Sequence, residues 1–466
     1  MRRIILSFRY VTAGAILAWG AATSGAGGVV PKLVGGNLVL NTGVTTNVGG
    51  VSVAYNGVNH EYRVAWFDSR ISGQNDVYAQ RVSADGKLLG DNVPIIVGAD
   101  STTDTSIAHD PDNNRYLITW RYQGGGPGSP GFNHTYGALA SAAGGLITSP
   151  LDLSNGGLEP TLVRNALSGE FFLEARNFAG GGVAGIRGQR IDASGQPVGA
   201  GIAIATTGAP APAGQVAWNP NANQYLATWR DQTAEDLKGR IINADGSLAT
   251  NPFTISPIFP ESGLAASVAF DPVNERYLVI FSRFSAGDIL GQFVGPTGTL
   301  IGSPFTIVAS PNRLAPFVVY NAVRGVFFLA WCDYGTGELF ALLLDEDGAA
   351  LGDVLQLNDA GTSAPRIETS TVAGLFLVTW VDYSNSPTRT DVVAQLVAVS
   401  SNKAGDLNCD GLVDFGDINP FVLALTNPAG YAAAFPYCDI MNGDINADGL
   451  VDFGDINPFV RLLTNP

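Results

Sequence analysis

A short alternating pattern of large apolar residues occurs seven times along the chain. An aromatic residue, an aliphatic residue and, in six copies, a second aromatic residue alternate with other positions. The copies are Tyr62-Val64-Trp66, Tyr116-Ile118-Trp120, Phe171-Leu173-Ala175, Tyr225-Ala227-Trp229, Tyr277-Val279-Phe281, Phe327-Leu329-Trp331 and Phe376-Val378-Trp380. Their last positions are 54, 55, 54, 52, 50 and 49 residues apart. A period of two predicts strands that each bury one face.

Further strands surround each copy. A shorter strand such as 215–220 (QVAWNP) precedes it across an Asn/Asp/Pro/Gly turn, and a third strand such as 240–246 (RIINADG) follows and ends at a glycine. A fourth strand, for example 251–256 (NPFTIS), completes the repeat. Four antiparallel strands in about 50 residues are typical of a β-propeller blade. The sequence therefore predicts a mainly β protein with a seven-bladed β-propeller over residues 31–400.

The ends of the array indicate how the ring closes. The seventh repeat stops at 394–401 (AQLVAVSS) without a fourth strand, while 31–42 (PKLVGGNLVLNT) precedes the first repeat and resembles an unpaired fourth strand. We expect this N-terminal strand to complete the last blade, since a closed ring leaves no free edge.

The repeats offer few candidate functional residues. The recurring tryptophans are expected to pack between blades rather than to stack on sugars. Four aspartates follow the alternating strands at one rim, and each either caps its own turn or joins an acidic ring that binds a cation or sugar hydroxyls: Asp68, Asp231, Asp333 and Asp382. Catalytic sequence motifs are absent, so whether the protein is an enzyme stays open. Carboxylates for glycoside hydrolysis can come from different blades, which sequence spacing does not reveal.

Composition and charge narrow the classes of partner. Glycine and proline together make 84 of the 466 residues, and the net charge is −16. Binding to nucleic acid needs clustered Lys and Arg, so we expect no nucleic-acid partner. Residues 405–466 hold nine aspartates, no glutamate and one arginine, which concentrates half of the net charge in the C-terminal tail.

This acidic tail contains a duplication. Residues 406–428 recur as 444–466 with four differences in 23 positions. Both copies place Asp, Asn, Asp, Gly, Asp and Asp at positions 1, 3, 5, 6, 9 and 12 of loops 406–417 and 444–455, a spacing that wraps oxygen ligands around Ca²⁺. The predicted ligands of two Ca²⁺ ions, counting a backbone carbonyl at position 7, are Asp406, Asn408, Asp410, Leu412, Asp414 and Asp417, and Asp444, Asn446, Asp448, Leu450, Asp452 and Asp455.

A short helix is expected after each loop, with Asn419 or Asn457 as the N-cap and the following proline at the first helical position. No amphipathic helix precedes Asp406, where the chain reads SSNKAG, so the copies are interpreted as half EF-hands with only the helix that follows each loop. The tail resembles the type I dockerin, and this resemblance implies a small α-helical calcium-binding module over 402–466 that binds a cohesin-like or cell-surface protein. Where such modules often carry a hydroxyl pair for cohesin contact, this chain has Phe415-Gly416 and Phe453-Gly454.

Three cysteines are too few for a disulfide scaffold. Cys409 in the first loop and Cys438 before the second are expected to form a disulfide in an exported protein. Cys332 beside Trp331 is expected to remain a free thiol in the core.

The N-terminus indicates export. Arg2, Arg3 and Arg9 form a positively charged region before a short apolar stretch over 10–22, and small residues follow, as in a signal peptide over 1–26. A twin-arginine signal is the alternative. No stretch reaches the ~18 apolar residues of a membrane span, so we expect a secreted, extracellular or cell-surface protein without such a span.

These expectations combine into one functional hypothesis. The tail anchors the propeller to a cohesin-like or surface protein, and the propeller binds carbohydrate or protein on its rim as part of polysaccharide breakdown. The alternatives are a propeller glycoside hydrolase or lyase that acts on O-glycosyl bonds of polysaccharides, and a structural protein of a surface layer.

Overall fold

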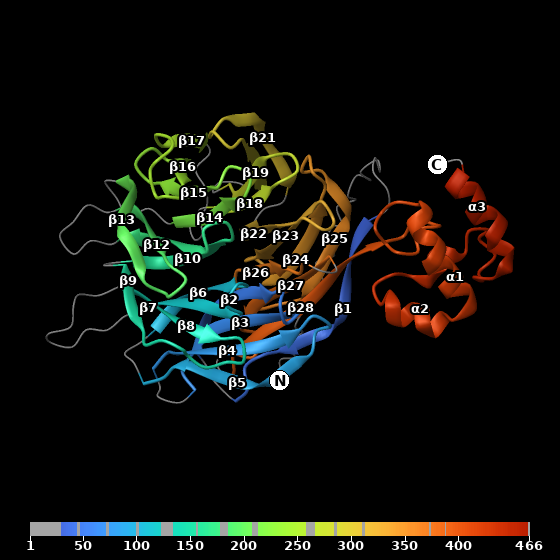
Figure 1. Cartoon of the computed structure of the whole chain (residues 1–466), viewed down its shortest axis with the longest axis horizontal. Coiled ribbons are helices and arrows are strands. Elements are labelled where there is room, and N and C mark those ends of the chain that lie inside the picture. Colours follow the sequence, from blue (N-terminus) through green and yellow to red (C-terminus); the bar gives the residue numbers. More distant parts are fainter. Residues whose placement is uncertain are drawn as a thin grey trace, which may run out of the picture.

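The computed structural model describes residues 29–464 except 44–46, 71–73, 99–101, 123–133, 155–156, 178–184, 207–212, 258–265, 284–286, 310–312, 372–373 and 387. The expected signal peptide, 1–26, lies outside the described residues. Within them, seven four-stranded antiparallel sheets are arranged around a central axis, and a group of short helices lies beside this ring (Figure 1). The predicted seven-bladed β-propeller is confirmed.

The first six blades each use four consecutive strands, in chain order from the axis outward. Their strands are β2 (Val48–Asn56), β3 (Glu61–Asp68), β4 (Asp76–Ser83), β5 (Leu88–Ile96); β6 (Thr102–Asp110), β7 (Arg115–Tyr122), β8 (His134–Ser141), β9 (Leu151–Ser154); β10 (Gly157–Asn165), β11 (Glu170–Asn177), β12 (Gly185–Ile191), β13 (Pro197–Thr206); β14 (Ala213–Asn219), β15 (Gln224–Asp231), β16 (Asp236–Asn243), β17 (Phe253–Ser256); β18 (Ser267–Asp271), β19 (Arg276–Ser282), β20 (Ile289–Val294), β21 (Leu300–Val308); and β22 (Arg313–Asn321), β23 (Val326–Asp333), β24 (Glu338–Leu344), β25 (Ala350–Asn358).

The seventh blade joins the two ends of the propeller sequence, as predicted. It contains β26 (Arg366–Thr369), β27 (Leu375–Asp382) and β28 (Asp391–Ser401), and its outer strand is β1 (Val29–Val39). Strands β1 and β28 are antiparallel, with Val29 opposite Ser401 and Val39 opposite Val393.

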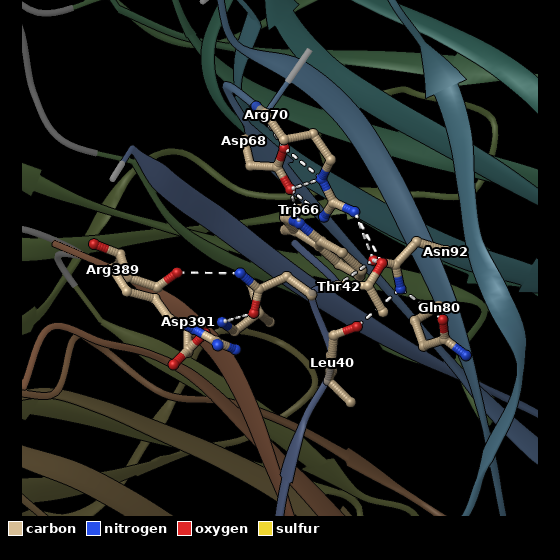
Figure 2. A network of polar contacts seen from close by, with 12 residues as sticks. Leu40, Thr42, Trp66, Asp68, Arg70, Gln80, Asn92, Arg389 and Asp391 are labelled. Atoms are coloured by element: carbon tan, nitrogen blue, oxygen red, sulfur yellow. Dashed lines mark hydrogen bonds and ion pairs between the residues drawn. The ribbon is translucent and has the colours of Figure 1, made fainter. Parts of the chain in front are cut away.

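A polar network fixes the point where the chain leaves β1 and enters the first blade (Figure 2). The Asn41 side chain is buried and donates to the Thr390 carbonyl at 3.1 Å, while its oxygen accepts from the Val392 amide at 2.8 Å. Asn92 of the first blade donates to the Leu40 carbonyl at 2.8 Å. The end of the closing strand is therefore held to the last blade by its own Asn41 side chain and to the first blade by the Asn92 side chain, in addition to the ladder between β1 and β28.

The recurring aromatic residues form the core between blades. Trp66, Trp120, Trp229, Trp331 and Trp380 are at most 2% exposed, which agrees with the predicted packing role. The glycines that end the third strands have φ values between +77° and +90° in five blades. Only glycine adopts this conformation without steric cost, which explains its recurrence at Gly86, Gly195, Gly246, Gly298 and Gly348.

The tail forms the helical part of the structure. Its helices are α1 (Ile418–Thr426), α2 (Pro428–Ala434) and α3 (Ile456–Thr464), with 3₁₀ turns η1 (Phe415–Asp417), η2 (Ile440–Gly443) and η3 (Phe453–Asp455). Leu407, Phe421, Ala424, Tyr431 and Phe459 are buried together and give this segment a small core of its own.

Candidate functional site

The two duplicated loops fold with the same backbone and the same internal contacts. In the first loop, Asp406 accepts the amides of Asp410 at 3.2 Å and Gly411 at 2.9 Å. In the second loop, Asp444 accepts the amides of Asp448 at 3.0 Å and Gly449 at 2.8 Å. Each loop thus folds over its first carboxylate, as a calcium loop must.

The contacts of loop positions 3 and 5 also agree between the two loops. The Asn408 side-chain oxygen accepts the amide of Asp410 at 2.9 Å, and Asp410 accepts the amide of Leu412 at 2.9 Å. The equivalent contacts of Asn446 and Asp448 measure 2.9 and 3.0 Å. The sharp turn at position 6 uses a left-handed glycine in both copies, with φ of +93° at Gly411 and +91° at Gly449.

The last aspartate of each loop holds both of its ends. Asp417 accepts the amides of Leu407 at 2.7 Å and Asn408 at 3.0 Å with one oxygen, and the amide of Asp414 at 3.0 Å with the other. Asp455 makes the matching contacts in the second loop at 2.8, 3.0 and 3.0 Å. Positions 1 and 12 are thereby brought to one side of a closed loop.

Several of these carboxylates are buried. Asp406, Asp417 and Asp455 have no exposed surface. Burial raises the pKa of Asp406 and of Asp417 above the usual range, and the Asp410 carboxylate adds to both shifts, whereas donated backbone amides lower them. The first loop therefore confines several negative charges at a free-energy cost that a bound cation would offset.

The donor set fits Ca²⁺, although it does not form a cluster of acidic groups. Within the described ranges, no three His, Cys, Asp or Glu side chains are grouped closely enough to hold a metal ion by themselves. In a twelve-residue calcium loop, an amide oxygen, a backbone carbonyl and water complete the ligand set beside the carboxylates. Asn408 and the Leu412 carbonyl supply the first two types of donor in loop one, and Asn446 and the Leu450 carbonyl supply them in loop two.

The helices after the loops begin earlier than predicted. Asp417 is the N-cap residue of α1, and Asp414 and Asp417 form a capping box around η1. Asn419 and Pro420, expected as N-cap and first helical residue, therefore lie inside the first turn. Proline is tolerated there because first-turn amides have no acceptor within the helix. The second copy repeats this arrangement with Asp452, Asp455 and α3.

Each loop and its helix expose a row of apolar side chains. Phe415 is 77% exposed and Phe453 is 74% exposed, so the residues that replace the hydroxyl pair face solvent. The neighbouring positions 7, 13 and 17 are also exposed in both copies. The two sets, called patch 1 and patch 2 below, are Leu412, Phe415, Ile418 and Val422, and Leu450, Phe453, Ile456 and Val460.

The tail is fastened to the propeller next to the first loop. Cys409 and Cys438 form a disulfide, while Cys332 is a free, buried thiol. Asn442 donates to the carbonyls of Ser401 at 2.9 Å and Asp406 at 2.8 Å. Because Ser401 ends β28, the first loop is linked to the blade that closes the ring (Figure 1).

The four rim aspartates cap their own turns. Asp231 accepts two amides, from Thr233 at 2.9 Å and from Ala234 at 3.1 Å. Asp333 and Asp382 accept amides two residues further on, each within 3.0 Å. Asp68 accepts from the Trp66 indole at 2.8 Å and forms an ion pair with Arg70 (Figure 2). These contacts favour the capping role over an acidic ring.

A cavity of about 860 Å³ runs along the propeller axis between the innermost strands. Its lining includes the charged residues Asp104, Glu159, Arg366 and Glu368. The confined walls desolvate Glu368 and raise its pKa to about 7, although the Thr369 amide lowers it. Sequence reasoning missed this site, because the residues come from separate blades at positions that share no motif.

The fold defines the protein as a seven-bladed β-propeller with a small C-terminal helical segment. A chain of hydrazine synthase from Kuenenia stuttgartiensis has a TM-score of 0.50 and 11% identity, over 76% of this chain and 98% of that chain. A chain from a nidogen–laminin complex has a TM-score of 0.32 and 14% identity, over 66% of this chain and 79% of that chain.

The likeness to the hydrazine synthase chain concerns the fold alone. No protein-family model matches the sequence, and no curated protein matches it. Among the helices that the structure describes, none is long and apolar enough to cross a membrane. The Cys409–Cys438 disulfide is typical of an oxidising, extracellular environment.

Proposed function

We propose that this protein is an exported β-propeller whose dockerin-like tail, residues 402–466, binds two Ca²⁺ ions and anchors the propeller to a cohesin-like or cell-surface protein. The observation that carries the proposal is the agreement between the two loops. Their carboxylates accept backbone amides at the same positions, with corresponding distances that differ by at most 0.2 Å. A turn with a purely structural role would not require the same set of oxygen donors to be kept at the same positions in two copies.

The tail surface favours a protein partner. Patches 1 and 2 lie at equivalent positions next to the loops, and each presents a phenylalanine more than 70% exposed. Large exposed apolar side chains in a group mark interaction sites, and aromatic anchors contribute much of the binding energy at protein interfaces. Ca²⁺ would fix the loops that carry these patches, so partner binding is expected to require calcium.

The calcium part is tested by isothermal titration calorimetry of the full chain after treatment with a chelator. We expect two bound Ca²⁺ ions per chain. Asp455→Asn keeps a side-chain acceptor for the Ile445 amide but removes a ligand charge, and is expected to reduce the stoichiometry to one. Asp439→Asn is the matched control, since Asp439 lies outside both loops and caps η2. Absence of binding heat for the native chain, or equal loss in both variants, would contradict the proposal.

The partner part is tested with a panel of immobilised type I cohesins in Ca²⁺ and in chelator. We expect calcium-dependent binding to at least one of them. The double variant Phe415→Ala/Phe453→Ala is expected to lose it while still binding two Ca²⁺ ions. If the native chain binds calcium but no cohesin, the cohesin assignment fails and the calcium assignment stands.

For the propeller we propose binding of a polysaccharide or protein segment on one rim. The axial cavity supports this proposal, because pockets of about 300–1,000 Å³ are typical ligand sites and its wall combines Arg366 with the carboxylates of Asp104 and Glu368. Binding of soluble polysaccharides, compared between the native chain and Arg366→Gln, tests it. Hydrolysis or cleavage of any of these polysaccharides would favour the glycoside hydrolase or lyase alternative instead.

A further inference from the structure

The third blade departs from the aromatic pattern that the other six share. At the last position of this pattern, the strands of the other blades carry Trp66, Trp120, Trp229, Phe281, Trp331 and Trp380, each at most 2% exposed. Strand β11 carries Ala175 instead, which is equally buried. An alanine leaves unfilled the volume that an indole or phenyl ring occupies in every other blade.

The neighbouring blades show where that volume lies. Trp120 of the second blade packs in one cluster with Ala79 and Ile95 of the first. Between the second and third blades the register equivalent of Ile95 is Leu153, because Ile96 pairs with Val77 and Ser154 pairs with Thr135. Leu153 and Ala175 both line a cavity of about 350 Å³. The cavity therefore lies where the missing ring would pack.

The cavity has an apolar base and a charged mouth. Leu153, Leu173 and Ala175 are at most 3% exposed and form the base. Asp152 and Arg187 line it as well, and both reach solvent. Arg187 stands opposite Ala175 across β11 and β12. A volume of this size lies at the lower end of the ~300–1,000 Å³ range of small-molecule sites.

The two charges at the mouth are not equivalent. The Asp152 carboxylate is 2.6 Å from His134 Nδ1, so a partner from the protein already engages it. Arg187 has no ion pair or hydrogen bond within the described part of the chain. An unpaired guanidinium favours a ligand carboxylate, with which it can form two parallel hydrogen bonds.

We propose that the cavity between the second and third blades binds a small aromatic carboxylate, with its ring over Ala175 and its acid group at Arg187. The ring takes the place that tryptophan fills in five other blades, and the carboxylate meets Arg187, which has no partner among the residues that the structure describes. This site is separate from the calcium loops and from the axial cavity, and the proposal does not depend on either.

Indole-3-acetate and neutral indole serve as probes, with calorimetry or competition measurements on the full chain. We expect indole-3-acetate to bind at least tenfold more tightly than indole. Arg187→Gln is expected to remove that difference and to leave indole binding unchanged. Lys87→Gln is the control, because Lys87 is an exposed cation of another blade. Failure of the native chain to bind either probe overturns the proposal.

Ala175→Trp tests the cavity itself. We expect it to abolish binding of both probes and to raise the melting temperature, since the ring fills space rather than displacing core. Unchanged probe binding, or a lower melting temperature in a folded variant, shows that the vacancy does not match a ring and overturns the proposal. If this variant does not fold, Ala175→Met blocks the same space with a flexible side chain, and the exposed Arg187→Gln keeps the test decisive.

Discussion

Ring closure can be tested at one side chain. Asn41→Ala removes the acceptor of the Val392 amide and the donor to the Thr390 carbonyl, both in a buried setting. Leaving a buried polar group without a partner costs about 1–3 kcal/mol. For two such groups, with partial relaxation, we expect a loss of about 3 kcal/mol in the free energy of unfolding.

The corresponding shift in melting temperature follows from the size of the propeller. An unfolding entropy of ~2.1 cal/mol/K per residue gives roughly 0.8 kcal/mol/K for a domain of this length. The expected decrease is therefore about 4 °C by differential scanning calorimetry, with a matching decrease in the urea midpoint.

Thr42→Ala provides the control for this measurement. Thr42 is adjacent in sequence, and its hydroxyl donates to Asn92 at an exposed position, so a change below about 0.5 kcal/mol is expected. If Asn41→Ala and Thr42→Ala destabilise the chain equally, the buried network does not hold the closing strand and the reasoning is refuted.

Three further outcomes are expected. Burial raises the pKa of Glu174 to about 8 from 4.5, so the folded state binds the proton more tightly than the unfolded state, and the free energy of unfolding falls by up to about 1.4 kcal/mol per pH unit as the pH rises between these values. Glu174→Thr should weaken this pH dependence, measured by urea titrations at pH 5 and pH 8, and an unchanged dependence would refute the assignment. Reduction of the Cys409–Cys438 disulfide, or its replacement by two alanines, opens a covalent loop whose ends are 29 residues apart. On a loop-entropy model this should lower the free energy of unfolding by roughly 3 kcal/mol, measured by thermal melting of the full chain with and without reductant. Asp231→Ala should lower the free energy of unfolding by about 1 kcal/mol through its lost turn cap without changing any polysaccharide binding. Lost binding would instead favour the hypothesis that Asp231 belongs to an acidic ring that binds ligand.

Much of the fold follows from patterns that the sequence displays directly. The alternating strands are visible because each central strand buries one face against a neighbouring blade, and the incomplete seventh repeat predicted the role of β1. Helix α2 is not predicted, because PAGYAAA has little periodicity and Tyr431 is its one buried residue in the core of the tail. The start of α1 was placed too late, because Asp414 and Asp417 were interpreted only as ligands although their carboxylates also cap the helix.

The candidate sites also differ in how far the sequence alone predicts them. The calcium loops use residues close in sequence at fixed spacing, so their donors could be assigned before any coordinates. The cavity at Ala175 depends on which faces of two blades meet, and the axial cavity depends on positions brought together from several strands. An alanine in one copy of a repeat becomes informative only when the side chain opposite it is known.

The seventh blade also sets the order in which the chain can finish folding. Strand β1 is synthesised first among the described strands, yet its partner β28 ends at Ser401, so β1 stays unpaired until almost the whole propeller has been made. Closing so long a loop is slow and entropically costly. A chain that stops short of β28 exposes two unpaired strand edges, at β1 and β27, where proteases and other chains can attach. Ring closure therefore distinguishes complete molecules from truncated ones, and the tail, which contacts the last residue of β28, is attached to the part of the structure that forms only in complete ones.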